Sequence, residues 1–203
     1  GNRLAFSRNQ ADPDIWRYQP GSAPAPLITS TLVDSNPQFS PDGNRIVFSS
    51  ARSGDVSEIW GVNADGSHPV QLTNRLGRYQ GTPRWSPDGR WIAFDSQGQD
   101  GRWDIWVVEA SGGRPRRVTS EPSDEHVPSW SRDGKWIYFY SNRTGGNQIW
   151  RVTSAGGQAE QITQKGGFVA FESADGKTLF YTKDEDSPLF AKPLTGGPER
   201  QVL

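Results

Sequence analysis

The sequence predicts an all-β protein, a β-propeller made of four-stranded antiparallel blades. The first observation is a repeat: its turn serines are Ser40, Ser86, Ser131 and Ser173, so the unit recurs after 46, 45 and 42 residues. The second is that each unit holds short apolar runs bounded by Gly, Pro, Asp or Ser, as antiparallel strands do. The third is the composition of the 203 residues, with 23 Gly, 15 Pro and 33% hydrophobic residues, which favours many chain reversals over one large core. A repeat of this length with four strands is typical of a propeller blade.

The clearest unit runs from Pro83 to Thr119. It begins with Pro-Arg-Trp-Ser-Pro-Asp-Gly and continues with apolar runs at 91–96, 104–108 and 117–119. The other units follow the same pattern, and the last keeps it only in degenerate form. We therefore expect a single domain, 1–203, whose five blades have the approximate bounds 1–30, 35–74, 81–119, 126–163 and 167–203.

The first blade is expected to lack its inner strand. Leu4–Ser7 matches the second strand of the repeat, Ile15-Trp16 the third and Leu27–Thr29 the fourth. The prediction is therefore nineteen strands, in one three-stranded and four four-stranded blades, with essentially no helix. Because the inner edge of Leu4–Ser7 would have no partner, we expect self-association, an open arc, or flanking sequence that completes the ring.

Two recurring features of the repeat have a mechanical reason. The Ser-Pro-Asp-Gly stretches suit a tight hairpin, since Pro presets φ, Asp bonds the local backbone and Gly adopts a positive φ. An Ile-Trp pair recurs in the third strand and places one side chain on each face of the sheet. Because stacked blades cover both faces, we expect Trp60, Trp106 and Trp150 to fill the gaps between blades rather than to form a platform for a ligand.

The run at 83–94, Pro-x-Trp-Ser-Pro-Asp-Gly-x-x-Ile-x-Phe, is followed by Asp-Ile-Trp at 104–106, and a Leu-Thr pair stands at 72–73. This pattern resembles the WD-like repeat of TolB-type β-propellers over nearly the whole chain. The resemblance implies a ring of six to eight blades, of which this chain would be a part. Such repeats are found in periplasmic translocation proteins, in peptidase propellers and in sensor regions of bacterial regulators. The compartment stays open, with a periplasmic or extracytoplasmic location favoured. Fold transfers well along such a resemblance and function poorly.

The two ends of the blades differ. The recurring face carries the first-to-second hairpins and the third-to-fourth turns, which hardly change from blade to blade. The variable face carries the second-to-third loops and the connections between blades, and differences at equivalent places can carry recognition. We expect ligand binding there, at the mouth of the central channel, although ordinary solvated loops are the alternative. The candidate residues, placed just before the inner strands, are Asp34, Asn36, Arg78, Tyr79, Gln80, Asp124, Glu125, His126, Lys165 and Phe168.

Composition argues against several classes of partner. The chain has no cysteine, so it can form no disulfide and no Cys-ligated zinc site. Its net charge is −1 with no basic run, which disfavours nucleic acid. No apolar run approaches membrane-spanning length, so we expect no membrane insertion by this chain. The absence of Met suggests a piece of a longer protein.

The motifs of common active sites are also missing. The sequence has no Gly-x-Ser-x-Gly, no His-Glu-x-x-His and no phosphate-binding glycine loop. The acids of 124–125 and 184–186 have oxygens that calcium could use, but solvated loop acids are the preferred interpretation. We expect no catalytic residue, no metal and no cofactor.

The resulting functional hypothesis is a non-catalytic propeller that binds a protein, a peptide or a small polar ligand at the channel mouth, or that serves as the sensor region of a larger bacterial regulator. The alternative is the propeller domain of an enzyme, either the substrate-gating domain of a serine peptidase or a lyase acting at the channel. The lack of an acid–base pair and the presence of only 2 His favour the binding module.

Overall fold

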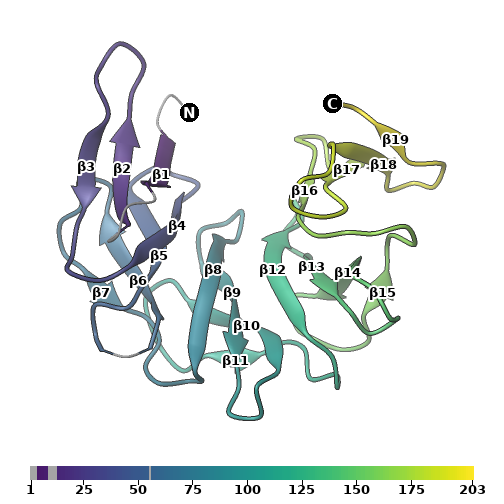
Figure 1. The fold of residues 1–203 in the computed structure, drawn as a ribbon, viewed down its shortest axis with the longest axis horizontal. Coiled ribbons are helices and arrows are strands. Elements are labelled where there is room, and N and C mark those ends of the chain that lie inside the picture. The colour runs from purple at the N-terminus through teal and green to yellow at the C-terminus, as the bar shows by residue number, and fades with distance from the viewer. Residues whose placement is uncertain (1–3, 9–12, 55) are drawn as a thin grey trace.

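The protein consists of five antiparallel sheets that follow one another along an open arc (Figure 1). This computed structural model describes residues 4–8, 13–54 and 56–203. The described residues form nineteen strands and no helix, in one three-stranded and four four-stranded sheets, so the predicted fold class and strand count are confirmed. The first and last sheets lie at the two ends of the arc (Figure 1).

Blades 1 and 2 show how the repeat begins. Blade 1 contains three described strands, which pair in the order of the chain. None of these three corresponds to the innermost strand of the other blades. In blade 2 each strand pairs with the next one along the chain. The strands of blade 1 are β1 (Leu4–Arg8), β2 (Asp14–Tyr18) and β3 (Ala25–Ile28), and those of blade 2 are β4 (Asp34–Phe39), β5 (Arg45–Ser50), β6 (Glu58–Asn63) and β7 (Val70–Gln71).

Blades 3 to 5 repeat this meander. The outermost strand is only two residues long in each of them, which limits the exposed edge of the sheet. Blade 3 comprises β8 (Tyr79–Trp85), β9 (Trp91–Gln97), β10 (Trp103–Glu109) and β11 (Arg116–Arg117). Blade 4 comprises β12 (Glu125–Trp130), β13 (Trp136–Ser141), β14 (Gln148–Thr153) and β15 (Glu160–Gln161), and blade 5 comprises β16 (Ala170–Glu172), β17 (Thr178–Tyr181), β18 (Phe190–Pro193) and β19 (Arg200–Gln201).

The hairpins on the recurring face are built from side-chain hydrogen bonds. Ser86 Oγ donates to Asp88 Oδ1 at 2.6 Å and accepts from the backbone N–H of Trp91 at 2.9 Å. Gly89 completes the turn with a φ of 70°, a conformation that costs glycine little. The serine hydroxyl and the backbone N–H of Arg90 stabilise the carboxylate, so the pKa of Asp88 is lowered. The same bonds recur at Ser40, Ser131 and Ser173.

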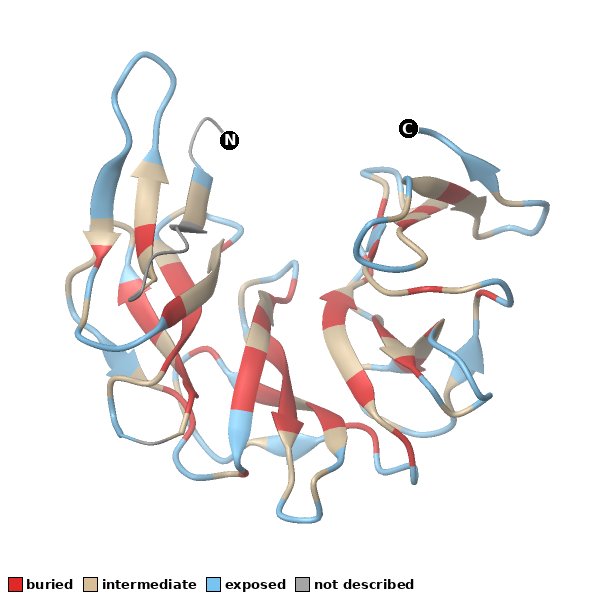
Figure 2. Cartoon of the chain, viewed as in Figure 1, coloured by how far each residue is buried: buried red, intermediate tan, exposed pale blue. Residues whose placement is uncertain are grey.

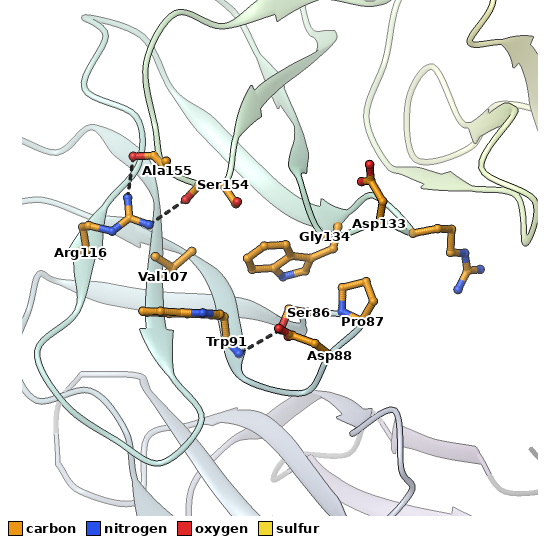
Figure 3. A pocket seen from close by; sticks show the side chains of 12 residues that line it. Ser86, Pro87, Asp88, Trp91, Val107, Arg116, Asp133, Gly134, Ser154 and Ala155 are labelled. Atoms are coloured by element: carbon orange, nitrogen blue, oxygen red, sulfur yellow. Dashed lines mark hydrogen bonds between the residues drawn. The ribbon is translucent and has the colours of Figure 1, made fainter.

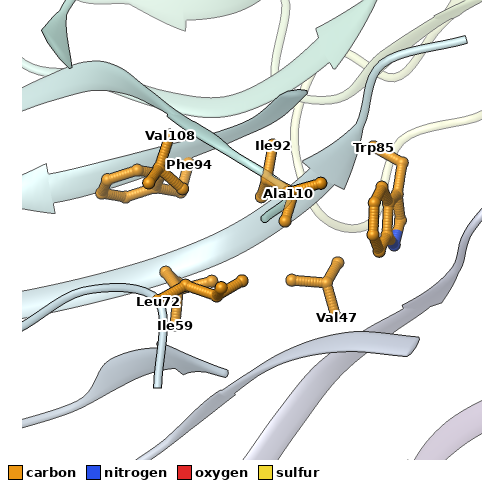
Figure 4. Close-up of a cluster of buried hydrophobic side chains, with 8 residues drawn as sticks. All are labelled: Val47, Ile59, Leu72, Trp85, Ile92, Phe94, Val108 and Ala110. Atoms are coloured by element: carbon orange, nitrogen blue, oxygen red, sulfur yellow. The ribbon is translucent and has the colours of Figure 1, made fainter. Parts of the chain in front are cut away.

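The hydrophobic core lies between the blades rather than inside one of them. The central strands carry most of the buried residues (Figure 2). Between blades 2 and 3, Val47 and Ile59 pack against Ile92 and Phe94 (Figure 4). The expectation for the three tryptophans is confirmed, because Trp60, Trp106 and Trp150 each pack against the core between their own blade and the preceding one.

The inner strands begin earlier than the sequence suggested. Six candidate residues were placed in connections before these strands, but they lie within β4, β8 and β12. A register shift interrupts each of these strands and centres on a residue with positive φ: Asn36 (53°), Thr82 (42°) and Val127 (51°). The left-handed region is unfavourable for β-branched residues, so the repeated packing of the blades must hold Thr82 and Val127 there.

Candidate functional site

Three of the predicted binding residues are fully buried instead of lining the channel mouth. Asp34, Gln80 and Glu125 have the same place in their blades and no exposed surface. Arg52 Nη2 donates to both carboxylate oxygens of Asp34, at 2.9 and 2.8 Å. Arg143 Nη2 donates to Glu125 Oε1 at 3.1 Å. The arginines of the second-to-third loops thus hold these loops to buried acids.

Blade 3 shows why these acids are structural. At the place of Arg52 and Arg143 it has Gly98, and its buried residue is the neutral Gln80. The Gln80 amide lies 3.4 Å from Ser96 Oγ, and its backbone carbonyl accepts from Ser57 Oγ at 2.9 Å. A buried carboxylate without a cation is costly. The repeat therefore loses the acid where it loses the arginine.

Three other predicted residues come together in a continuous line of rings on the variable face. The line, which we call the aromatic row, runs across blades 3, 4 and 5. Successive ring centroids are 5.5, 4.6, 4.9 and 5.1 Å apart. Stacked and tilted rings at these distances attract one another. Its members in order are Tyr79, Trp103, His126, Tyr140 and Phe168.

The aromatic row is partly open to solvent and lies beside carboxylates. Tyr79 is 38% exposed, and the other four members are half-buried. Burial lowers the pKa of His126, against the opposing effect of Asp95 and Asp124, so its imidazole is neutral near pH 7. Burial also raises the pKa of Tyr140 to about 12, with smaller contributions from nearby carboxylates. The row therefore offers uncharged rings in a negative surrounding.

Asp95 ties the centre of the row to the strained backbone. Its Oδ2 accepts the hydroxyl of Thr82 at 2.5 Å and the backbone N–H of Val127 at 3.0 Å. Asp124 also binds a member of the row, because its Oδ1 accepts the backbone N–H of Trp103 at 3.2 Å. These bonds connect blades 3 and 4 next to His126 and at Trp103, and so help to fix the positions of these two rings.

The remaining predicted residues do not join the row by direct ring contact. Asn36 lies on blade 2, where its amide is 3.4 Å from both Ser35 Oγ and Ser49 Oγ. Arg78 is exposed next to Tyr79 and lines a cavity of about 520 Å³ between blades 2 and 3. Lys165 is exposed in the connection to blade 5.

Sequence reasoning missed Trp103 and Tyr140, although the repeat contained a signal for both. Trp103 occupies the place held by Ser57 in blade 2, and Tyr140 occupies the place held by Ser49. A large aromatic residue at a position that is otherwise small and polar marks a departure from the pattern. Such departures on the variable face are the strongest hint of recognition that a single repeat sequence gives.

The recurring face has a cavity of about 600 Å³ between blades 3 and 4 (Figure 3). Arg116 lies at its wall and donates to the backbone carbonyls of Ser154 and Ala155, at 2.7 and 3.0 Å. The hairpin residues Pro87 and Asp88 form another side (Figure 3). Because the guanidinium is already bound to the next blade, this cavity is a joint between blades.

The described residues contain neither a metal-binding cluster nor a membrane-spanning helix. No three acidic or histidine side chains gather there in a way that could hold a metal ion. No helix that could span a membrane occurs among the residues described.

Five successive meanders around a common arc define the chain as a β-propeller domain. Residues 56–203 match the model of the Tricorn protease N-terminal beta propeller domain. This match covers well over half of the chain, so the chain belongs to that family of propeller domains, and its repeat is TolB-like as the sequence pattern implied. Comparison with curated proteins gave no match.

Solved structures support the same fold. A protein assigned as TolB from Agrobacterium tumefaciens is 26% identical, with a TM-score of 0.84 over 97% of this chain and 76% of that one. TolB from Acinetobacter baumannii is 23% identical, with a TM-score of 0.79 over 98% of this chain and 52% of that one. A puromycin-hydrolyzing peptidase of Mycobacterium tuberculosis is 16% identical, with a TM-score of 0.71 over 96% of this chain and 37% of that one. The chain thus spans about half of the second TolB and just over a third of the peptidase.

Proposed function

We propose that this chain is a non-catalytic propeller module that binds a protein or peptide partner on its variable face, with the aromatic row as the contact surface. The observation that carries the proposal is the row itself, a line of partly exposed rings that crosses three blades. Aromatic side chains dominate the energetics of protein interfaces because they bury large areas with little loss of conformational freedom. A sensor or interaction region of a larger regulator is one setting in which such a surface would serve.

The charges around the row favour a polypeptide over a polyanion. Besides burial, three carboxylates raise the pKa of Tyr140 through their negative charge: Asp95, Asp124 and Glu185. Each of them would repel a nearby phosphate. Exposed Arg78 stands beside Tyr79 and adds one cation at the end of the row. A peptide with apolar and cationic side chains fits this pattern, and a small polar ligand is the alternative occupant.

We expect the variants Tyr79→Ala and Trp103→Ala each to weaken partner binding by more than about 1 kcal/mol, since aromatic positions carry most interface energy. Peptides selected from a displayed random library on the wild-type protein would serve as the probe. Binding would be measured by isothermal titration of each variant, with a thermal melt to confirm folding.

Variants on the recurring face provide the control. Asp65→Ala and Asp88→Ala should lower the melting temperature and leave peptide affinity unchanged, because both carboxylates bind local turn atoms. If folded Asp65 and Asp88 variants lost binding while the row variants kept it, the proposal would have the wrong face.

A second candidate function is the propeller domain of a larger peptidase. It is favoured by the match to a propeller family described from a protease. In that case the row would contact substrates on their way to a catalytic domain. Assays of the full-length protein with long and short chromogenic peptides would separate the two. If the propeller gates substrates, Trp103→Ala should change the KM of long substrates only. If the chain is a binding module, the wild-type protein should hydrolyse neither the long nor the short peptides.

We also propose that blade 1 mediates self-association. Among the described strands β1 pairs only with β2, so its other edge is free. Two exposed large hydrophobic residues belong to this sheet, Leu4 on β1 itself and its partner Tyr18 on β2. A free edge next to apolar surface invites pairing with another chain.

The self-association proposal predicts a concentration-dependent increase in sedimentation coefficient for the wild type. Replacing Leu4, which is 57% exposed, with lysine should reduce it, since a charge at a free edge opposes pairing. The matched control is Val70→Lys, an exposed site on blade 2 away from the free edge. A wild type that stays monomeric at all concentrations would contradict the proposal.

A further inference from the structure

The channel wall contains an arginine whose charge is not neutralised. Arg84 lies on β8 and is half-buried. Its side chain makes one hydrogen bond to the described residues, from Nη1 to the carbonyl of its neighbour Pro83, at 2.9 Å. Among the described residues, no carboxylate oxygen comes within 4.0 Å of its guanidinium. Burial lowers the pKa of Arg84, and the charge of Asp95 only partly offsets this. Four of its five N–H donors therefore lack an acceptor in the described part of the chain.

The repeat shows that this position normally has another task. Its equivalent in blade 2, Gln38, accepts the backbone N–H of Trp85 at 2.7 Å. Its equivalent in blade 4, Ser129, donates to the carbonyl of Ala170 at 2.5 Å. In both cases the side chain ties its blade to the next one. The side chain of Arg84 makes no such bond to a described residue of another blade. Its backbone carbonyl connects to blade 4 instead, because it accepts the indole N–H of Trp130 at 3.0 Å. The guanidinium is thus not needed to join the blades.

Arg84 lines a cavity of about 440 Å³ between the inner strands of blades 2 to 5. Besides two prolines, the apolar part of the wall consists of aromatic residues from all four blades: Phe39, Trp85, Trp130 and Phe171. Phe171 is 45% exposed, so the cavity has uncovered apolar surface as well as unused hydrogen-bond donors. Its volume is within the range of small-molecule sites.

One carboxylate shares the cavity, and its bonds show that it does not serve Arg84. Glu172 Oε1 accepts the hydroxyl of Tyr138 at 2.6 Å, and Oε2 accepts the backbone N–H of Arg132 at 2.8 Å. Both oxygens are thereby used within blades 4 and 5. Arg132 also lines the cavity, so its charged side chains are two cations and one anion, a balance that suits a singly charged ligand better than a dianion such as phosphate. The cavity therefore suits one planar anion.

We propose that Arg84 binds a carboxylate whose neighbouring group is aromatic or apolar, with the guanidinium pairing the anion and the channel aromatics covering its apolar part. Guanidinium and carboxylate match in geometry and form two parallel hydrogen bonds. This site lies on inner-strand residues toward the recurring face, so it is independent of the aromatic row. The carboxylate could belong to a small organic acid or to a polypeptide.

The test compares 3-phenylpropionate with its neutral isostere 3-phenylpropionamide, by titration into the wild-type protein followed in ¹H–¹⁵N spectra. Trp85 and Trp130 are reporters because their indole N–H groups bond to the carbonyls of Gln38 and Arg84 beside the cavity. We expect saturable shifts of both signals with the acid and none with the amide. Equal shifts with the amide, or none with the acid, would overturn the proposal.

Variants separate the ligand role from a structural one. Arg84→Met should weaken acid binding at least tenfold and leave the melting temperature equal to or above that of the wild type, because it removes an unneutralised charge. Arg84→Lys should keep part of the binding, since it retains the charge. The control Arg90→Gln changes the same charge at an exposed site on the recurring face and should bind as the wild type does. Undiminished binding by Arg84→Met would refute the assignment.

A last arm distinguishes the source of the carboxylate. Acetyl-Gly-Gly-Phe with a free carboxylate is compared with 3-phenylpropionate. Binding at least tenfold tighter by the peptide supports the end of a polypeptide as the natural ligand, and equal binding supports a small acid.

Discussion

Replacing Arg143 with methionine is expected to destabilise the protein by about 3–5 kcal/mol at neutral pH, because it leaves a buried carboxylate without its cation. Glu125 is fully buried, and its Oε2 has no hydrogen-bond partner in the described residues. Its Oε1 would retain only the hydroxyls of Ser123 and Ser141, at 2.5 and 2.9 Å. Chemical denaturation of wild type and variant at pH 7 measures the difference.

The loss of stability caused by Arg143→Met should be smaller at low pH. Burial already raises the pKa of Glu125 above its ordinary value, and removal of Arg143 raises it further. A carboxyl group whose pKa is raised by folding contributes stability at low pH that is lost as pH rises through the raised value. The penalty of Arg143→Met should therefore shrink as the pH falls through the raised pKa toward the ordinary range. A penalty independent of pH would show that lost packing, not the uncompensated charge, is the cause.

Blade 3 supplies the matched control for this prediction. The double variant Glu125→Gln with Arg143→Met copies the neutral arrangement of Gln80. It should recover most of the lost stability, since a neutral amide at a buried site costs less than a carboxylate. A double variant as unstable as Arg143→Met alone would contradict this explanation.

Replacing Trp85 with alanine is expected to cost about 3–5 kcal/mol, the usual loss when a buried tryptophan is truncated. Trp85 is 6% exposed and packs against Val47 of blade 2 and Ile92 of its own blade (Figure 4). Its indole N–H also donates to the carbonyl of Gln38 at 3.2 Å. The substitution therefore removes both the packing and the hydrogen bond that hold two neighbouring blades together. Urea denaturation of the wild type and of the purified variant measures this loss of stability.

Two variants place bounds on the Trp85 effect. Trp85→Phe should lose much less, because blade 2 has Phe39 at the equivalent position. Tyr79→Ala, at a site that is 38% exposed, should change stability by less than about 1 kcal/mol. If Trp85→Ala were no more destabilising than Tyr79→Ala, the blades would not depend on this contact.

Periodic features of this protein were predictable from the sequence because each depends on local chemistry that recurs. Ser86, Asp88 and Gly89 form the same turn wherever their types recur, since the bonds are between residues at most a few positions apart. The strand count and the packing of Trp60, Trp106 and Trp150 followed from period and alternation alone.

The candidate site was only partly predictable. Tyr79, His126 and Phe168 were chosen because the sequence placed them in connections that vary, whereas Trp103 and Tyr140 come from other strands of blades 3 and 4. The choice also included Asp34, Gln80 and Glu125, which burial removes from the surface. Nothing local distinguishes a buried Glu125 from the half-buried His126 beside it.

The sequence by itself determined the blades of this protein, their number in this chain, their turns and the residues between them, because hairpins and alternating strands are fixed by interactions close along the chain. Only the tertiary structure decided which side chains meet across blades. The aromatic row, the acid–arginine pairs and the uncompensated charge of Arg84 all depend on contacts between separate strands or blades. Such contacts are set by the register shifts at Asn36, Thr82 and Val127 and by the angle between sheets, which the repeat pattern does not encode.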